Sequence, residues 1–141
     1  MIEMILQAGA GVVPGRKLAR AAVCFLSEFL ADENLVHDLD LALTEACANV
    51  VRHAYAGREI GDVRIRLALS PGVEVRLEVT DWGVGFDTRR CDAKPAPSDE
   101  GGRGLFIIKN LADEMHVSCG GGKTVVSLMK KAGPAAWKPC E

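Results

Sequence analysis

The sequence has no excess of basic residues. Its 141 residues include 17 Lys and Arg against 19 Asp and Glu, for a formal net charge of −2, and the basic residues are scattered along the chain. A protein that binds the phosphate backbone of nucleic acids usually has a basic excess or a clustered basic face. The composition therefore argues against direct nucleic-acid binding and leaves small ligands and protein partners open.

Long apolar runs and paired cysteine motifs are also absent. No apolar run reaches about 18 residues, the length of a membrane span, and no basic stretch followed by an apolar one marks the N-terminus as a signal peptide. The five cysteines are widely spaced without a C-x-x-C pair, and Cys24 and Cys47 lie in apolar helical patterns. We therefore expect five free thiols, a cytoplasmic location and no membrane contact.

The pattern of apolar residues predicts an α/β protein. Its length fits one domain, which we expect over residues 1–131, followed by a frayed tail over 132–141. The expected elements are a strand over 1–8, a loop over 9–15 with Pro14 and Gly15, helices over 16–31 and 34–55, a hairpin over 62–81, a loop over 86–102, a helix over 103–115 and a second hairpin over 116–130. Asn34 is the expected cap of the second helix. This order favours a two-layer α+β sandwich, with a mixed, mainly antiparallel sheet and helices on one face.

The predicted helix over 34–55 carries an unusual polar stripe in "LTEACANVVRHAY". Glu45, Asn49 and His53 follow one another at a spacing of four residues, so they lie one above the other on one helix face beside an apolar stripe. Such a stripe is either a solvated face or the wall of a polar site. For His53, packing or a hydrogen bond at the helix end is the simpler interpretation.

A second feature is "TDWGVGFD", where Asp81 follows a predicted strand and Gly83 and Gly85 come behind it. An aspartate fixed at a strand end can accept a hydrogen bond from an exocyclic amine, and glycines let the backbone pass close to a ring. An ordinary turn would use the same residue types.

A third feature is "EGGRGLFIIKN", where Gly101, Gly102 and Gly104 precede a predicted helix. A glycine-rich entry to a helix exposes backbone N–H groups beside the positive end of the helix dipole, which favours phosphate binding. The stretch is neither a Walker loop nor a dinucleotide-binding fingerprint, and a plain flexible loop is the alternative.

Taken in order, the three features resemble the Bergerat-fold, or GHKL, ATPase superfamily, which includes gyrase, heat-shock chaperones, histidine kinases and mismatch-repair ATPases. "TEACANVVRHAY" resembles its N box, "DWGVGFD" its G1 box and "GGRGLFIIKN" its G2 box. The resemblance covers roughly residues 10 to 130 and implies the histidine-kinase-like ATPase fold with an ATP site.

The resemblance also implies roles for the residues of the first two boxes. Asp81 would bind the adenine amino group, in a pocket shaped by Gly83 and Gly85. Asn49 would coordinate Mg²⁺ through its amide oxygen, which suits a hard cation that also contacts phosphates. Glu45 matches the general base that polarises the attacking hydroxyl or water.

Further roles are implied for the G2 box and the last hairpin. Gly102 and Gly104 would approach the phosphates, and Leu105 belongs to the same box. From its place in the loop we infer that Arg103 pairs with a phosphate. Thr124 in "GGKTVV" matches a late position near the nucleotide. The stretch over 86–100 would be the ATP lid, whose closure excludes water.

The short, stand-alone architecture is most similar to the anti-sigma factor serine/threonine kinases of this superfamily. That similarity implies ATP and Mg²⁺ as cofactors, a sigma factor and an anti-anti-sigma (STAS-type) protein as partners, and a homodimer. The alternatives are a nucleotide-binding interaction module of the same fold without kinase turnover, and an α/β domain without a nucleotide site. Trp82 departs from the family pattern, because it is bulkier than the polar residue expected between Asp81 and Gly83.

Overall fold

The computed structural model describes residues 1–55, 59–83 and 100–139, and for residues 100–103 the backbone alone. Its elements, in chain order, are β1 (Ile2–Gly9), α1 (Val12–Phe29), α2 (Glu33–Asn49), the π-helical turn η1 (Val50–Ala54), β2 (Asp62–Ser70), β3 (Glu74–Asp81), α4 (Glu100–Leu111), β4 (Glu114–Gly120), β5 (Lys123–Lys131) and the 3-10 turn η2 (Pro134–Ala136).

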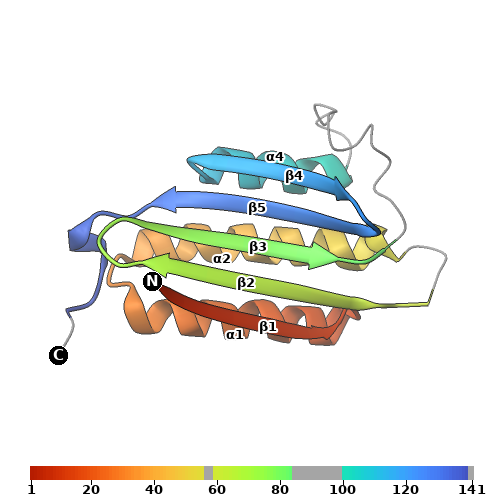
Figure 1. Cartoon of the computed structure of the whole chain (residues 1–141), viewed down its shortest axis with the longest axis horizontal. Helices are drawn as coiled ribbons and strands as arrows, with labels where there is room; N and C mark the ends of the chain where they lie inside the picture. Colours follow the sequence, from red (N-terminus) through yellow and green to blue (C-terminus); the bar gives the residue numbers. More distant parts are fainter. Residues whose placement is uncertain (56–58, 84–99, 140–141) are drawn as a thin grey trace.

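The strands form one five-stranded sheet in the order β1-β2-β3-β5-β4, and each described pair of neighbours is antiparallel. The described α-helices lie on one face of the sheet, with α2 between α1 and α4 (Figure 1). The predicted two-layer α/β sandwich with helices on one face is therefore confirmed, but the sheet is not mixed, because all four described strand pairs are antiparallel.

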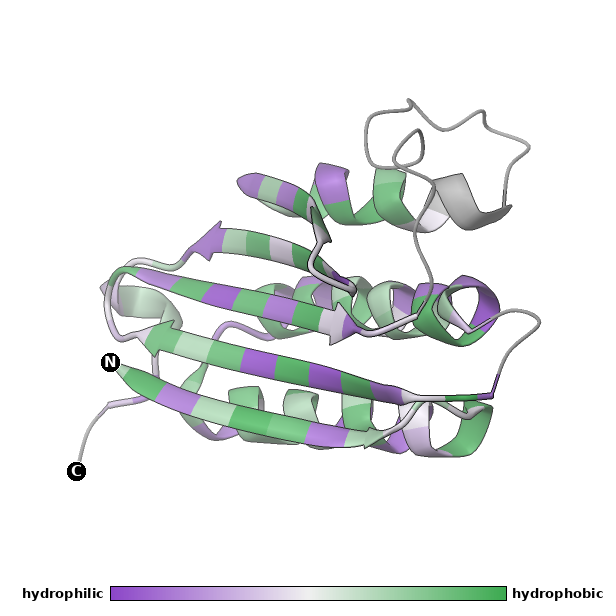
Figure 2. Ribbon diagram, turned by 45° about the vertical axis from the view of Figure 1, so that its right-hand side comes forward, coloured by the Kyte–Doolittle hydropathy of each residue, from purple (hydrophilic) through white to green (hydrophobic). Residues whose placement is uncertain are grey.

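A single hydrophobic core fills the space between the helices and the sheet. Hydrophobic and hydrophilic residues alternate along β2 and β3 (Figure 2), so each strand turns one set of side chains toward the helices. Leu26 of α1, Leu43 of α2 and Ile108 of α4 are fully buried. Complete burial of such a side chain stabilises the fold by about 1.5–3 kcal/mol.

The first helix begins earlier than the sequence predicts. α1 starts at Val12, so Pro14 and Gly15 lie in its first turn rather than in a loop. Proline is tolerated there because the first-turn N–H groups have no partner within the helix. Gly15 lies close to η1, since a Cβ on Gly15 would stand 3.3 Å from Cγ2 of Val51.

The second helix differs from the prediction at both ends. Asp32, not Asn34, is the cap: its Oδ1 accepts hydrogen bonds from the N–H groups of Asn34 at 3.0 Å and Leu35 at 3.1 Å. At the other end α2 stops at Asn49 and the chain continues as η1. The polar stripe at α-helical spacing is therefore regular only from Glu45 to Asn49, because a π-helical turn holds more residues.

The expectation of a frayed C-terminal tail is wrong for residues 132–138. The backbone of Trp137 pairs with Leu30, and the N–H of Lys138 donates to the carbonyl of Phe29 at 2.8 Å. The indole N–H of Trp137 donates to the carbonyl of Ala132 at 2.9 Å. The tail is ordered because it satisfies the backbone groups that α1 leaves unpaired where it ends.

The expectation of five free thiols is wrong for Cys119, which is disulfide-bonded, whereas Cys24 and Cys47 are free. Cysteine spacing alone does not reveal such pairing in a chain of this length. Among the described helices, none combines the length and the apolar composition that a membrane span requires.

Candidate functional site

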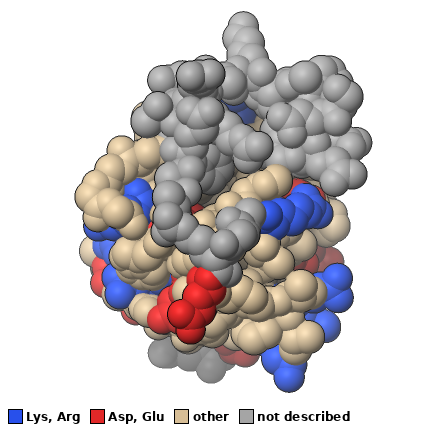
Figure 3. All heavy atoms as spheres, turned by 90° about the vertical axis from the view of Figure 1, so that its right-hand side faces the viewer, with Lys and Arg blue, Asp and Glu red and all other residues tan. Residues whose placement is uncertain are grey.

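Three elements that carry the sequence motifs meet at one end of the molecule. The C-terminal half of α2, the end of β3 and the start of α4 all lie at the right-hand end in Figure 1. Figure 3 looks onto this end, where acidic and basic side chains are interspersed with uncharged residues. The fold thus brings together residues that are far apart in the sequence.

Asn49, the last residue of α2, carries a buried amide that has no hydrogen-bond partner in the part of the chain that the structure describes. Its side chain is 4% exposed, and neither Nδ2 nor Oδ1 has a hydrogen-bond partner among the described residues. A buried polar group usually finds a partner, and an unpaired one costs about 1–3 kcal/mol. The amide is therefore a candidate ligand-binding group.

Gly104 of α4 faces this amide and Glu45 at close range. A Cβ on Gly104 would stand 3.3 Å from both Nδ2 and Oδ1 of Asn49 and 3.2 Å from Oε2 of Glu45. A larger residue would enter the space in front of both polar groups. The glycine predicted to approach a phosphate therefore lies beside Glu45, the predicted general base, and Asn49, the predicted Mg²⁺ ligand.

Asp81, the last residue of β3, is a buried carboxylate that is 4% exposed. Burial raises its pKa from 3.8, and the N–H of Gly83, which donates to Oδ1 at 3.0 Å, acts in the opposite direction. In the sheet Asp81 pairs with Val63 of β2 and with Thr124 of β5, and Thr124 is also buried. Asp81 and Thr124 are thus neighbours at one strand end, as candidate residues of one pocket would be.

Gly83 lies against the π-helical turn. A Cβ there would stand 1.9 Å from the carbonyl oxygen of Ala54, which no side chain could tolerate without a shift of the backbone. The G1 glycine is therefore required for packing of the strand end against the helix that carries Asn49.

Three further predicted site residues, Gly102, Arg103 and Leu105, lie in α4. Gly102 and Arg103 are in its first turn, near the helix N-terminus that favours anions. Leu105 is half-buried and packs against the hydrophobic core. The side chain of Arg103, Gly85 and the predicted lid up to residue 99 lie outside the described residues.

Sequence reasoning missed Tyr55, which joins the two strand ends beside Asp81. Its hydroxyl donates to the carbonyl of Asp62 at 2.6 Å and accepts from the N–H of Trp82 at 3.0 Å. Its one available signal was its place as the chain's single tyrosine, at the end of the polar helix. Trp82 is 38% exposed, with Cζ of Arg64 5.0 Å from the centre of its ring.

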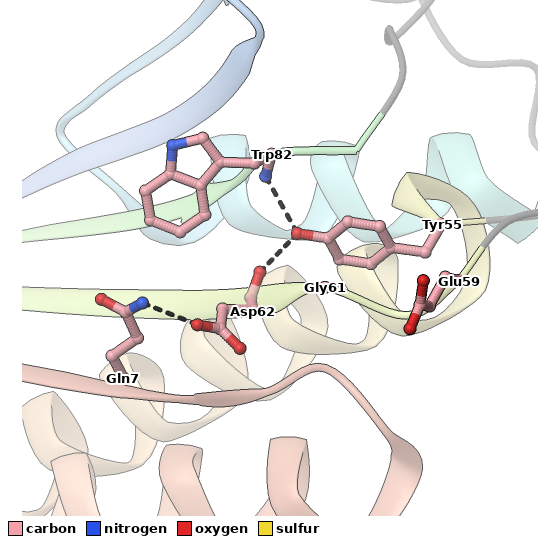
Figure 4. A pocket seen from close by; sticks show the side chains of 6 residues that line it. All are labelled: Gln7, Tyr55, Glu59, Gly61, Asp62 and Trp82. Atoms are coloured by element: carbon pink, nitrogen blue, oxygen red, sulfur yellow. Dashed lines mark hydrogen bonds between the residues drawn. The ribbon is translucent and has the colours of Figure 1, made fainter.

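The described residues line cavities next to the site. One, of about 490 Å³, is lined by Gln7, Tyr55, Glu59, Gly61, Asp62 and Trp82 (Figure 4). The other, of about 500 Å³, lies between α1 and α2, and Glu45 lines it together with Arg16, Arg20 and Arg52. Glu45 therefore lies close to Gly104 and also borders this basic cavity.

The chain matches the family model described as the histidine kinase-like ATPase domain over residues 15–130. A curated relative from Bacillus cereus (strain AH187), named serine-protein kinase RsbW, is 35% identical over 136 residues, which is 89% of this chain and 81% of the relative. Its namesake from Bacillus anthracis has the same identity and coverage.

A solved structure has the same fold. The RsbU and RsbW domains of Rv1364c from Mycobacterium tuberculosis match with a TM-score of 0.69 at 21% identity, over all of this chain. The match covers 34% of that longer chain, so the present chain spans about a third of it.

Proposed function

Because the chain belongs to the histidine kinase-like ATPase domain family, we propose that it is a cytoplasmic protein serine/threonine kinase that uses Mg-ATP. The unpaired amide of Asn49, with Glu45 one helical turn away and Gly104 in front of both, is the observation that carries this proposal. The relatives named serine-protein kinase support protein phosphorylation over simple ATP hydrolysis.

The residues fit a magnesium ion held mainly by the nucleotide. Among the described residues no three His, Cys, Asp or Glu side chains gather as a metal site. One amide oxygen, from Asn49, is what Mg²⁺ needs when phosphates and water supply its other ligands. The bound ion would neutralise charge on the phosphates during transfer.

The other site residues bind and orient the nucleotide, and one of them moves a proton. Asp81 accepts the hydrogen bond of the adenine amino group, and the N–H of Gly83 holds its carboxylate in place. Glu45 accepts the proton of the attacking hydroxyl as general base. The first turn of α4 presents N–H groups to the phosphates, and Gly104 keeps this helix close to Glu45.

The basic cavity between α1 and α2 is the proposed approach for the protein substrate. It reaches Glu45, and Arg16, Arg20 and Arg52 give it positive charge. An acceptor segment with acidic residues next to its serine or threonine would match this charge. By resemblance to the anti-sigma factor kinases, we propose that the partners are an anti-anti-sigma (STAS-type) protein as substrate and a sigma factor held by a homodimer.

Transfer of radiolabel from ATP to a cognate anti-anti-sigma protein tests this function. We expect transfer by the wild type, and none by Glu45→Ala with ATP affinity unchanged, because this substitution removes the base and not the nucleotide contacts. Thr44→Ala is the matched control. Thr44 lines the same cavity, but its hydroxyl donates a hydrogen bond to the carboxylate of Asp40 within α2.

A second outcome would favour the alternative function. Nucleotide binding without transfer to any cognate partner would indicate a binding module in which ATP acts as a structural switch. Transfer that persists at the wild-type rate in Glu45→Ala would remove Glu45 from the proposed mechanism.

A further inference from the structure

The hydroxyl of Tyr55 takes the place of a hydrogen bond of the sheet. The antiparallel pairing of β2 with β3 reaches Val63 and Asp81, so Asp62 and Trp82 are the next pair. Instead of a direct bond between them, the Tyr55 hydroxyl donates to the carbonyl of Asp62 and accepts from the N–H of Trp82 (Figure 4). The helical turn η1 is thereby tied to both strand ends.

Two glycines make this arrangement possible. A Cβ on Gly61 would stand 2.7 Å from Cε1 and Cζ of the Tyr55 ring, so only glycine leaves room for the ring there. On the other strand, Gly83 leaves room for the carbonyl of Ala54. Ala54 and Tyr55, at the end of the helical segment, are therefore each packed tightly against a strand end.

The same contacts surround Asp81. Its neighbour Trp82 is fixed through its N–H by Tyr55, and Gly83 donates to its carboxylate. The backbone on the C-terminal side of Asp81 is thus held by a residue that follows directly from the helix carrying Glu45 and Asn49. We call these contacts of Tyr55 with Asp62 and Trp82 the tyrosine bridge.

We propose that Tyr55 is a positioning residue for base recognition, which sets Asp81 in place relative to Asn49 and thereby determines the preference for adenine over guanine nucleotides. This inference rests on the proposed function, in which Asp81 binds the base. An aspartate accepts a hydrogen bond from the amino group of adenine, whereas guanine presents a carbonyl oxygen at that position, which the carboxylate repels. The discrimination is strong only if the carboxylate is held in place.

Tyr55→Phe removes the hydroxyl and keeps the ring. It leaves the carbonyl of Asp62 and the N–H of Trp82 without the bridge, so the strand ends can move and Asp81 with them. Ser27→Ala is the matched control, because it removes one hydroxyl that donates to a backbone carbonyl, that of Val23 at 2.9 Å, within α1. Both variants lose one buried or half-buried hydroxyl, but only the first touches the strand ends beside Asp81.

The test is isothermal titration of Mg-ATP and of Mg-GTP into the wild type, Tyr55→Phe, Ser27→Ala and Asp81→Asn. We expect Tyr55→Phe to lose about tenfold in ATP affinity and to move the ratio of ATP to GTP affinity toward that of Asp81→Asn. Ser27→Ala should retain both wild-type values. A purely structural role of Tyr55 would lower the melting temperature without a change in this ratio.

The outcomes separate the two proposals. If Asp81→Asn loses ATP but Tyr55→Phe keeps the wild-type affinity and ratio, the positioning role is overturned and the kinase proposal stands. If the folded, nucleotide-free wild type binds no ATP, the proposed function itself fails.

A second measurement applies if Tyr55→Phe does not fold. Replacement of tyrosine by 3-fluorotyrosine during expression labels Tyr55 alone, since it is the single tyrosine of the chain. The ¹⁹F resonance should shift when ATP binds to the wild type and stay unchanged with GTP at the same concentration. An unchanged resonance at saturating ATP would overturn the positioning role.

Discussion

Gly104 of α4 lies directly in front of the unpaired amide of Asn49 at the end of α2, where a Cβ would stand 3.3 Å from both Nδ2 and Oδ1. Two helices far apart in the sequence therefore approach each other so closely at this point that only glycine fits without a shift of its neighbours. A side chain at this position would press on the amide of Asn49 and on the carboxylate of Glu45.

Gly104→Ala should reduce nucleotide affinity without loss of stability. The added methyl group would displace the side chains of Asn49 and Glu45, so we expect ATP to bind about tenfold or more weakly. Alanine is the better helix former, by about 0.5–1 kcal/mol, so the melting temperature without ATP should not fall. Titration calorimetry and thermal unfolding measure the two effects. Gly133→Ala is the control, since a Cβ there meets no atom within 4 Å; unchanged ATP affinity in Gly104→Ala would contradict the site.

Asn49→Ala should abolish the magnesium dependence of ATP binding. In the wild type a hundredfold excess of ligand over its Kd raises the free energy of unfolding by about 2.7 kcal/mol, and we expect a larger thermal shift with Mg-ATP than with ATP in EDTA. The variant should give the same shift in both, because the amide oxygen is missing. Asn110→Ala removes an exposed amide of α4 and is the matched control. If Mg-ATP still gave a larger thermal shift than ATP in EDTA with Asn49→Ala, the cation would be bound by other residues.

Asp81→Asn should stabilise the nucleotide-free protein. Because burial raises the pKa of Asp81 above 3.8, the unfolded state ionises first as the pH rises, and the free energy of unfolding falls from about pH 4 until the folded carboxyl has also ionised. At neutral pH an asparagine avoids this penalty, so we expect the melting temperature to rise by about 3 °C, while the ATP-induced shift disappears. Thermal unfolding as a function of pH, with and without ATP, measures the change in melting temperature and the ATP-induced shift. Equal pH profiles for the two proteins would show that Asp81 carries no such penalty.

Trp137→Ala should destabilise the fold, because the C-terminal segment is paired with the end of α1. Loss of the half-buried indole and of its hydrogen bond to Ala132 should lower the free energy of unfolding by about 2 kcal/mol. Urea unfolding measures the change. Trp137→Phe keeps the ring contact and should lose about half as much, whereas Leu41→Ala, at an exposed position, should have little effect. A wild-type midpoint for Trp137→Ala would mean that the segment adds no stability.

Much of the fold could be predicted from the sequence because its elements depend on local patterns. The alternation over residues 62–81 predicted β2 and β3, and the spacing of Leu105, Ile108 and Leu111 predicted α4. The boundaries depend on single contacts and were less accurate. Asp32 replaced Asn34 as the cap because its carboxylate reaches two N–H groups.

The candidate site, too, could be predicted from the sequence only in part. The chemical types of Glu45, Asn49 and Asp81, and their order in the chain, were sufficient to suggest a nucleotide site of the GHKL kind. The sequence could not predict Tyr55, because its hydroxyl acts only where β2 and β3 end together.

The sequence by itself determined the periodicity of the strands and helices and the polar and glycine residues of the three motifs, because these follow from the spacing of residues that are near one another in the chain. Only the tertiary structure decided which groups stand unpaired and how close the elements come. The π-helical turn, the contact of Gly83 with Ala54 and the close approach of Gly104 to Asn49 each depend on two segments packed together. Such contacts are set by the shape of the whole core, which no local pattern records.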